Sequence, residues 1–186
     1  MSNAAYRLYA VACILMVGVF ILSAACQDPG AASGAGPAPA KKGLDADGRM
    51  QISETDRCPV CAMPVAEHER FSAAIVLSDG SAYYFCSAGC MLRAWVNPVH
   101  YLNRQPVALR RPVARDYFTG DFIDGRRALW ISGSDVIGPM GPALVAIQSE
   151  DDLAVFRRRH GAGTVFSLSA LNAGTWETLT GKPAGG

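Results

Sequence analysis

The chain has 186 residues, of which 50% are hydrophobic and 18% are charged. This size is enough for one core or two small ones, and it excludes a disordered tail and a multi-domain enzyme. The 17 basic residues nearly balance the 16 acidic ones, to a net charge of +1. Because nucleic-acid binding needs clustered excess positive charge, we expect no nucleic-acid partner.

The first 25 residues have the layout of a secretory signal. Arg7 precedes an almost uninterrupted apolar run, and small residues close it. Residues 22–26, with the sequence Leu-Ser-Ala-Ala-Cys, resemble a bacterial lipoprotein processing site, although Ser23 stands where a large apolar residue is usual. We therefore expect residues 1–25 to be a lipoprotein signal peptide and Cys26 to be lipidated, with an uncleaved membrane anchor as the alternative.

The next segment, residues 26–55, is rich in Ala, Gly and Pro. Such a composition buries little apolar surface and cannot offset the entropy of ordering, so we expect a flexible tether. With the lipid, the tether would hold the folded part on the outer side of a membrane. The expected location is therefore the periplasmic side of the cell envelope.

The first folded segment is expected over residues 56–118. The apolar run 71–77, the turn signal Ser-Asp-Gly at 78–80 and the aromatic run 81–85 predict a β-hairpin. Ser87 stands where a helix cap is expected, and the helix would end at the Asn-Pro pair at 97–98. We expect residues 106–118 to form a returning strand.

The second folded segment, over residues 119–180, shows the same order. Residues 127–131 and 143–147 are typical of strands, and 164–168 of a third. Between them, an acidic start at 149–152 and a basic end at 157–160 match the dipole of a helix. The pattern predicts two consecutive β-β-α-β units and an α+β fold.

Three sulfur-bearing side chains lie within six positions: Cys58, Cys61 and Met63. Alternate side chains of an extended segment face the same way, and Pro64 favours extended geometry before it, so Cys61 and Met63 would point at one ion. A turn at Pro59 would add Cys58. Thiolate and thioether ligands select Cu(I), which makes this a candidate copper site. A disulfide, a redox pair or half a zinc site are the alternatives.

A second pair, Cys86 and Cys90, is four residues apart across the expected helix start. With Cys58 and Cys61, this pair would complete a closed four-thiolate zinc site, which is the strongest competing interpretation. A second metal site or a disulfide is also open. Since an oxidising compartment favours disulfides, the state of all four thiols stays open at this point.

Met140 lies in the segment Gly-Pro-Met-Gly at residues 138–141. A methionine in such a turn has little helix or strand to pack in, so it is a candidate further soft ligand for the first cluster. Packing at the interface between the two units is an equal alternative.

Three stretches resemble the nitrous-oxide reductase accessory protein family (NosL). They are Cys-Pro-Val-Cys-Ala-Met at residues 58–63, Asp-Tyr-Phe-Thr-Gly at 116–120, and the Gly-rich segment 131–141. The likeness covers most of the chain from residue 56 to 171. The family commonly has Gly where this chain has Ala62, and Cys86 with Cys90 is not part of its core pattern.

The resemblance implies a membrane-anchored lipoprotein that binds Cu(I). Members pass the ion towards nitrous-oxide reductase, the enzyme of denitrification, and assist assembly of its copper-sulfur centre together with an ABC-type membrane complex. Their fold is described as two β-β-α-β units, similar to part of organomercurial lyase. The family's ligands map onto Cys61, Met63 and Met140.

The expected function is therefore that of a periplasmic metallochaperone, which binds and transfers Cu(I) and catalyses no reaction. Thioethers suit transfer because they need no deprotonation and exchange readily. The alternatives are a zinc-stapled interaction module that uses all four cysteines, or a thiol-disulfide protein of the cell envelope.

Overall fold

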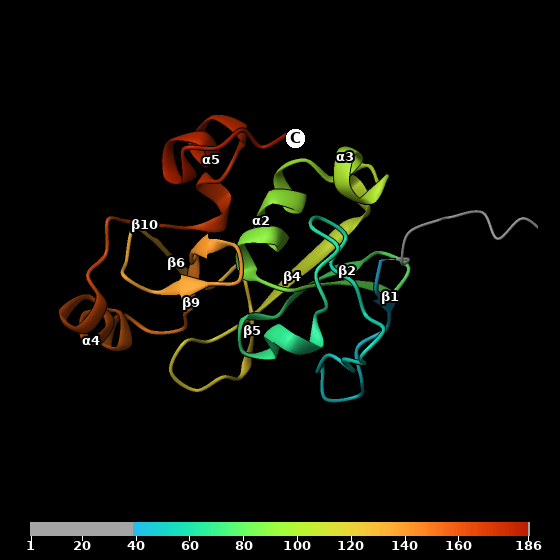
Figure 1. Cartoon of the computed structure of the whole chain (residues 1–186), viewed down its shortest axis with the longest axis horizontal. Coiled ribbons are helices and arrows are strands. Elements are labelled where there is room, and N and C mark those ends of the chain that lie inside the picture. The colour runs from blue at the N-terminus through green and yellow to red at the C-terminus, as the bar shows by residue number, and fades with distance from the viewer. Residues whose placement is uncertain (1–38, 186) are drawn as a thin grey trace, which may run out of the picture. The chain divides into compact units, whose positions relative to one another are not determined.

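The larger sheet of the protein grows from the expected hairpin (Figure 1). The structure is a computed structural model that describes residues 39–185. β2 (Ala73–Leu77) is the central strand and pairs antiparallel with β3 (Ala82–Phe85) and with β4 (Leu109–Arg115). The short strands β1 (Lys41–Lys42) and β5 (Phe122–Asp124) flank them, in the order β1-β3-β2-β4-β5.

Two helices follow the hairpin. α2 (Ala88–Val96) begins after Ser87, whose side chain accepts a hydrogen bond from the backbone N–H of Cys90 and caps the helix as expected. α2 ends before the Asn-Pro pair, but Pro98 then opens a second short helix, α3 (Pro98–Leu102). Proline suits a first helical position because its missing N–H would have no partner there.

The three strands of the smaller sheet repeat the arrangement of β2, β3 and β4. Its central strand is β6 (Leu129–Ser132), which pairs antiparallel with β9 (Val145–Ile147) and with β10 (Thr164–Phe166). α4 (Glu150–His160) connects β9 to β10 and is capped by Ser149. In both β2-β3-α2-β4 and β6-β9-α4-β10 the first strand is central and the helix precedes the last strand, which agrees with the expected β-β-α-β order.

Short elements complete the fold. The remaining ones are the 3-10 turns η1 (Ala66–Phe71), η2 (Pro106–Ala108) and η3 (Leu168–Ala170), the small hairpin of β7 (Ile137–Gly138) and β8 (Gly141–Pro142), and the final helix α5 (Ala173–Thr180). α5 packs beside α2 (Figure 1). No helix within residues 39–185 is long and apolar enough to cross a membrane.

Residues 39–55, which were expected to belong to the flexible tether, pack against the folded part. Residues 1–38, with the predicted signal peptide and Cys26, lie outside the described residues. From residue 39 onward the chain packs on the larger sheet: Ala40 and Met50 are buried, and the Tyr84 hydroxyl donates to the carbonyl of Gly43 over 2.7 Å. This stretch has few apolar side chains, but they pack against the sheet. Composition alone does not predict that contact.

The division of the folded part at residues 118 and 119 stays a prediction. β5 follows that boundary in sequence, yet it pairs with β4 in the larger sheet. The two sheets are also joined there, because Asp116 forms a parallel β-bridge with Ala146 in β9.

A buried carboxylate makes that junction. Asp116 is 2% exposed and follows β4 directly. One carboxylate oxygen accepts hydrogen bonds from the backbone N–H groups of Phe118 and Thr119, each over 2.9 Å, and the other accepts from the N–H of Gln148 over 2.8 Å. One side chain therefore closes the turn after β4 and attaches it to the end of β9.

We predict that Asp116→Ala lowers the free energy of unfolding by about 2–4 kcal/mol, because it leaves several partly buried N–H groups without acceptors. Urea unfolding of the reduced chain measures this change. The control is Asp121→Ala, since Asp121 is exposed and lies in the same turn; it should change stability by less than about 0.5 kcal/mol. Equal effects of the two substitutions would contradict this role for Asp116.

Candidate metal centre

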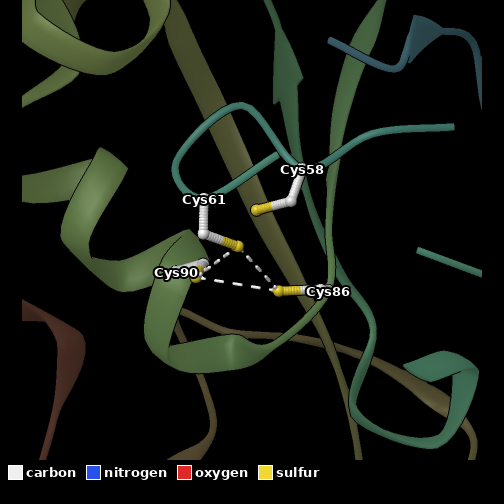
Figure 2. A group of neighbouring side chains, drawn as sticks. All are labelled: Cys58, Cys61, Cys86 and Cys90. Carbon is white, nitrogen blue, oxygen red and sulfur yellow. Dashed lines mark hydrogen bonds between the residues drawn. The ribbon is translucent and has the colours of Figure 1, made fainter. Parts of the chain in front are cut away.

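Four cysteine sulfurs gather at one point of the larger sheet (Figure 2). The Sγ atoms of Cys58, Cys61, Cys86 and Cys90 all lie within 4.8 Å of one another. Cys61 Sγ is 3.4 Å from that of Cys86 and 3.8 Å from that of Cys90, and the last two are 3.8 Å apart. All four cysteines are free thiols. We call this group the thiol cluster.

The first two cysteines lie on a loop that closes on itself. The backbone N–H of Cys58 donates to the carbonyl of Met63 over 3.0 Å, and that of Ala62 donates to the carbonyl of Cys58 over 2.9 Å. Ala62 has a φ of 61°, in the left-handed region that favours glycine. The expected extended path from Cys61 to Met63 is therefore wrong, because a left-handed residue reverses the chain between them.

The other two cysteines flank the start of α2. Cys86 follows β3 directly, and Cys90 lies in the first turn of the helix. Both are buried, as is Cys58, whereas Cys61 is partly exposed. The cluster thus has three buried sulfurs beneath one that is partly accessible. The positive end of the helix dipole favours negative charge at this position.

Contacts between the thiols lower the pKa of Cys61 and raise that of Cys90. Hydrogen bonds from Cys58 first, and then from Cys86 and Cys90, hold the pKa of Cys61 far below its usual range. The pKa of Cys90 is raised far above its usual range, by its contacts with Cys58 first and then with Cys61 and Cys86, with burial adding to them. In the metal-free cluster these contacts favour the thiolate form of Cys61 and the protonated form of Cys90.

A cavity of about 330 Å³ adjoins the cluster. Cys90 and Val60 line it from the cluster side, and Trp176 lines it from α5. Met140 also lines it, from the turn between β7 and β8, and is 46% exposed. The structure thus places Met140 and a cluster cysteine on the walls of one cavity.

The structure brings together cysteines that the sequence presented as two pairs. Met63 is half-buried and packs against the same core as the cluster. The expected elements already indicated half of this cluster. A hairpin that ends at residue 85 and a helix capped by Ser87 place Cys86 and Cys90 together at one edge of the larger sheet. The position of the loop 58–63 over that edge is a long-range contact, which no local pattern shows.

The geometry suits a soft metal ion. A tetrahedral thiolate site with metal–sulfur bonds of about 2.3 Å has sulfurs roughly 3.8 Å apart. The three separations between the sulfurs of Cys61, Cys86 and Cys90, 3.4, 3.8 and 3.8 Å, are close to that size. Thiolate sulfur binds both Cu(I) and zinc, and the geometry suits either ion.

Fold and site together define an α+β protein with a partly buried sulfur cluster for a soft metal. The NosL family model matches residues 49–175, and the chain belongs to this family. A relative from Stutzerimonas stutzeri, the copper-binding lipoprotein NosL, is 24% identical over 140 residues, which are 74% of this chain and 73% of the relative. The family resemblance stated from the sequence is thereby confirmed.

A solved structure shares the fold. The crystal structure of the copper chaperone NosL from Shewanella denitrificans superimposes with a TM-score of 0.57 at 18% identity. The match covers 67% of this chain and 96% of that one. This likeness confirms the expected α+β fold.

Ala62 offers a direct test of the loop geometry. An L-residue in the left-handed region is strained by about 1–2 kcal/mol, whereas glycine is not. We predict that Ala62→Gly raises the free energy of unfolding by about 0.5–1 kcal/mol after the greater chain entropy of glycine is counted. Urea unfolding of the reduced chain measures this.

The matched control for Ala62→Gly is Ala154→Gly. Ala154 is exposed in the middle of α4, where glycine costs about 1 kcal/mol. The same replacement should therefore have opposite signs at the two positions. Destabilisation at both would show that residue 62 is not left-handed.

The acidity of Cys61 predicts its reactivity. In the reduced, metal-free chain we expect Cys61 to react with iodoacetamide at nearly the same rate at pH 6 as at pH 8, because its low pKa keeps it a thiolate throughout. An ordinary thiol slows roughly 80-fold over this interval. Peptide mass spectrometry measures the rates, with Cys90 as the internal comparison. An ordinary pH profile at Cys61 would contradict the assignment.

Proposed function

We propose that this chain is a Cu(I) carrier, which binds the ion through two cysteines of the thiol cluster and two methionines and transfers it to a partner without catalysing a reaction. The observation that carries the proposal is the meeting of four cysteine sulfurs within 4.8 Å, in a protein of the NosL family. The name of the Stutzerimonas relative, a copper-binding lipoprotein, supports copper as the cargo.

The proposed ligands are Cys58, Cys61, Met63 and Met140. Sulfur donors of both kinds, thiolate and thioether, favour Cu(I) over zinc, which takes methionine rarely. Cys61 offers a thiolate without loss of a proton at neutral pH, since its pKa is held low by its neighbours. Met140 lines the adjoining cavity and is partly exposed, so it supplies a ligand from the outer side.

Transfer would proceed by ligand exchange. The cavity, which Met140 lines, gives an incoming donor atom of the partner a path to the edge of the site. Met140, on an exposed turn, would be the first protein ligand replaced, because a neutral thioether leaves without taking up a proton. The partner's ligand would bind before the last cysteine leaves, so that the ion is not released into solution.

The proposed location is the periplasmic side of a membrane, with a lipid on Cys26 as the anchor. An anchor confines carrier and acceptor to one surface and raises their effective concentration. By family membership, we propose nitrous-oxide reductase and its ABC-type maturation complex as the partners. The carrier would then act in the assembly of the copper-sulfur centre.

A zinc-stapled interaction module is the second candidate. It is favoured by the cluster itself, because four thiolates at this spacing are also the ligand set of a closed structural zinc site. In that case the ion would stabilise the fold and would not exchange. The two methionines separate the candidates, since only the copper site uses them.

The test is competition for Cu(I) with a coloured chelator, under anoxic reducing conditions and with the full chain in detergent. We expect tight binding by the wild type. Met63→Leu and Met140→Leu should each weaken it at least about tenfold, and Cys61→Ser should weaken it more. Met50→Leu is the control, because Met50 is buried in a different part of the core.

Each result decides between the candidates. Copper binding that Met50→Leu leaves intact and the other three substitutions weaken would support the carrier. Loss of copper to a weak chelator, together with retention of one zinc ion that Met63→Leu does not affect, would overturn the carrier in favour of the zinc module.

A further inference from the structure

Cys86 and Cys90 have no part in the copper site proposed above, yet they lie in direct contact with it. Figure 2 shows the sulfurs of Cys61, Cys86 and Cys90 joined in a triangle, with Cys58 beside it. The sides of this triangle are 3.4, 3.8 and 3.8 Å. We call it the thiol triangle.

The triangle has the dimensions of a site in its own right. An ion at its centre would lie about 2.1 Å from each sulfur, which approaches the metal–thiolate bond length of about 2.3 Å. Three thiolates in a plane around one ion satisfy the low coordination number that Cu(I) accepts. The triangle uses Cys61 but leaves Cys58 unused.

The site has more sulfur donors than one Cu(I) ion can coordinate. With an ion in the triangle, the thiol of Cys58 and the thioethers of Met63 and Met140 remain. Cys58 Sγ lies within 4.8 Å of the three sulfurs of the triangle, so a thiolate of the triangle can bridge a first ion and a second one bound to Cys58. Thiolate sulfur has the free electron pairs that such a bridge requires.

Charge favours the same arrangement. Cys58, Cys86 and Cys90 are buried in an apolar core with Phe85 and Leu92, where a thiolate without a neighbouring cation is costly. A monovalent ion offsets only one thiolate. Each further Cu(I) ion therefore lowers the negative charge that the four cysteines carry when all of them bind metal.

We infer that the four cysteines bind at least two Cu(I) ions as one thiolate-bridged cluster, with one ion in the thiol triangle and a second shared between Cys58 and Cys61. The inference rests on the proposed function and extends it, because the cargo becomes a cluster of ions. Cys86 and Cys90 are then ligands and not a separate structural pair.

The experiment measures copper stoichiometry on the full chain in detergent. The reduced chain is loaded with excess Cu(I) under anoxic conditions and passed through a column with a weak chelator, and copper per chain is then determined. Copper X-ray absorption on the same sample detects scattering between neighbouring copper ions. We expect at least two ions per chain and a copper–copper distance in the spectrum.

The variant Cys86→Ser with Cys90→Ser should retain one tightly bound ion and lose the copper–copper signal. Met91→Leu is the control, since Met91 is a buried sulfur beside Cys90 and should change neither result. If the double variant does not fold, the wild-type count and spectrum still decide the matter.

One tightly bound ion in the wild type, without copper–copper scattering, would overturn the two-ion cluster and leave the proposed carrier standing. Failure of the wild type to retain any copper would overturn both. The two failures are therefore distinguishable in one sample.

Discussion

The structure depends on one long-range contact, the closure of the loop 58–63 over the start of α2. Two backbone hydrogen bonds hold the loop in a tight ring, and the left-handed Ala62 lets the chain turn back within it. Cys58 and Cys61 thereby meet Cys86 and Cys90, which the end of β3 and the Ser87 cap have already fixed. Without that closure the chain would have two cysteine pairs and no common metal centre.

The second unit completes the surroundings of this centre. Asp116 joins the end of β4 to that of β9, so the smaller sheet is tied to the larger one. The turn between β7 and β8 carries Met140, and α5 lines the same cavity. The two units therefore share an arrangement of strands but have different roles. The first supplies the thiols, and the second lines the approach to them.

Local patterns predicted the elements well, and long-range contacts account for the errors. The hairpin, the Ser87 cap and the acidic start of α4 were all predictable, because turn and cap residues act on their neighbours. The packing of residues 39–55 was not, since its few apolar side chains gain their partners from a distant strand. Nor was the turn at Ala62, because alanine disfavours the left-handed region and only the family's usual glycine suggests it.

The central claim is that a copper ion binds among the sulfurs of the thiol cluster. The most direct measurement is a copper-edge anomalous difference map from crystals of the chain loaded with Cu(I) under anoxic conditions. We expect a strong peak within bonding distance of the Cys61 sulfur, the ligand that the proposed site and the thiol triangle share. A map with no copper peak at the cluster, or with the copper bound at another place in the molecule, would contradict it.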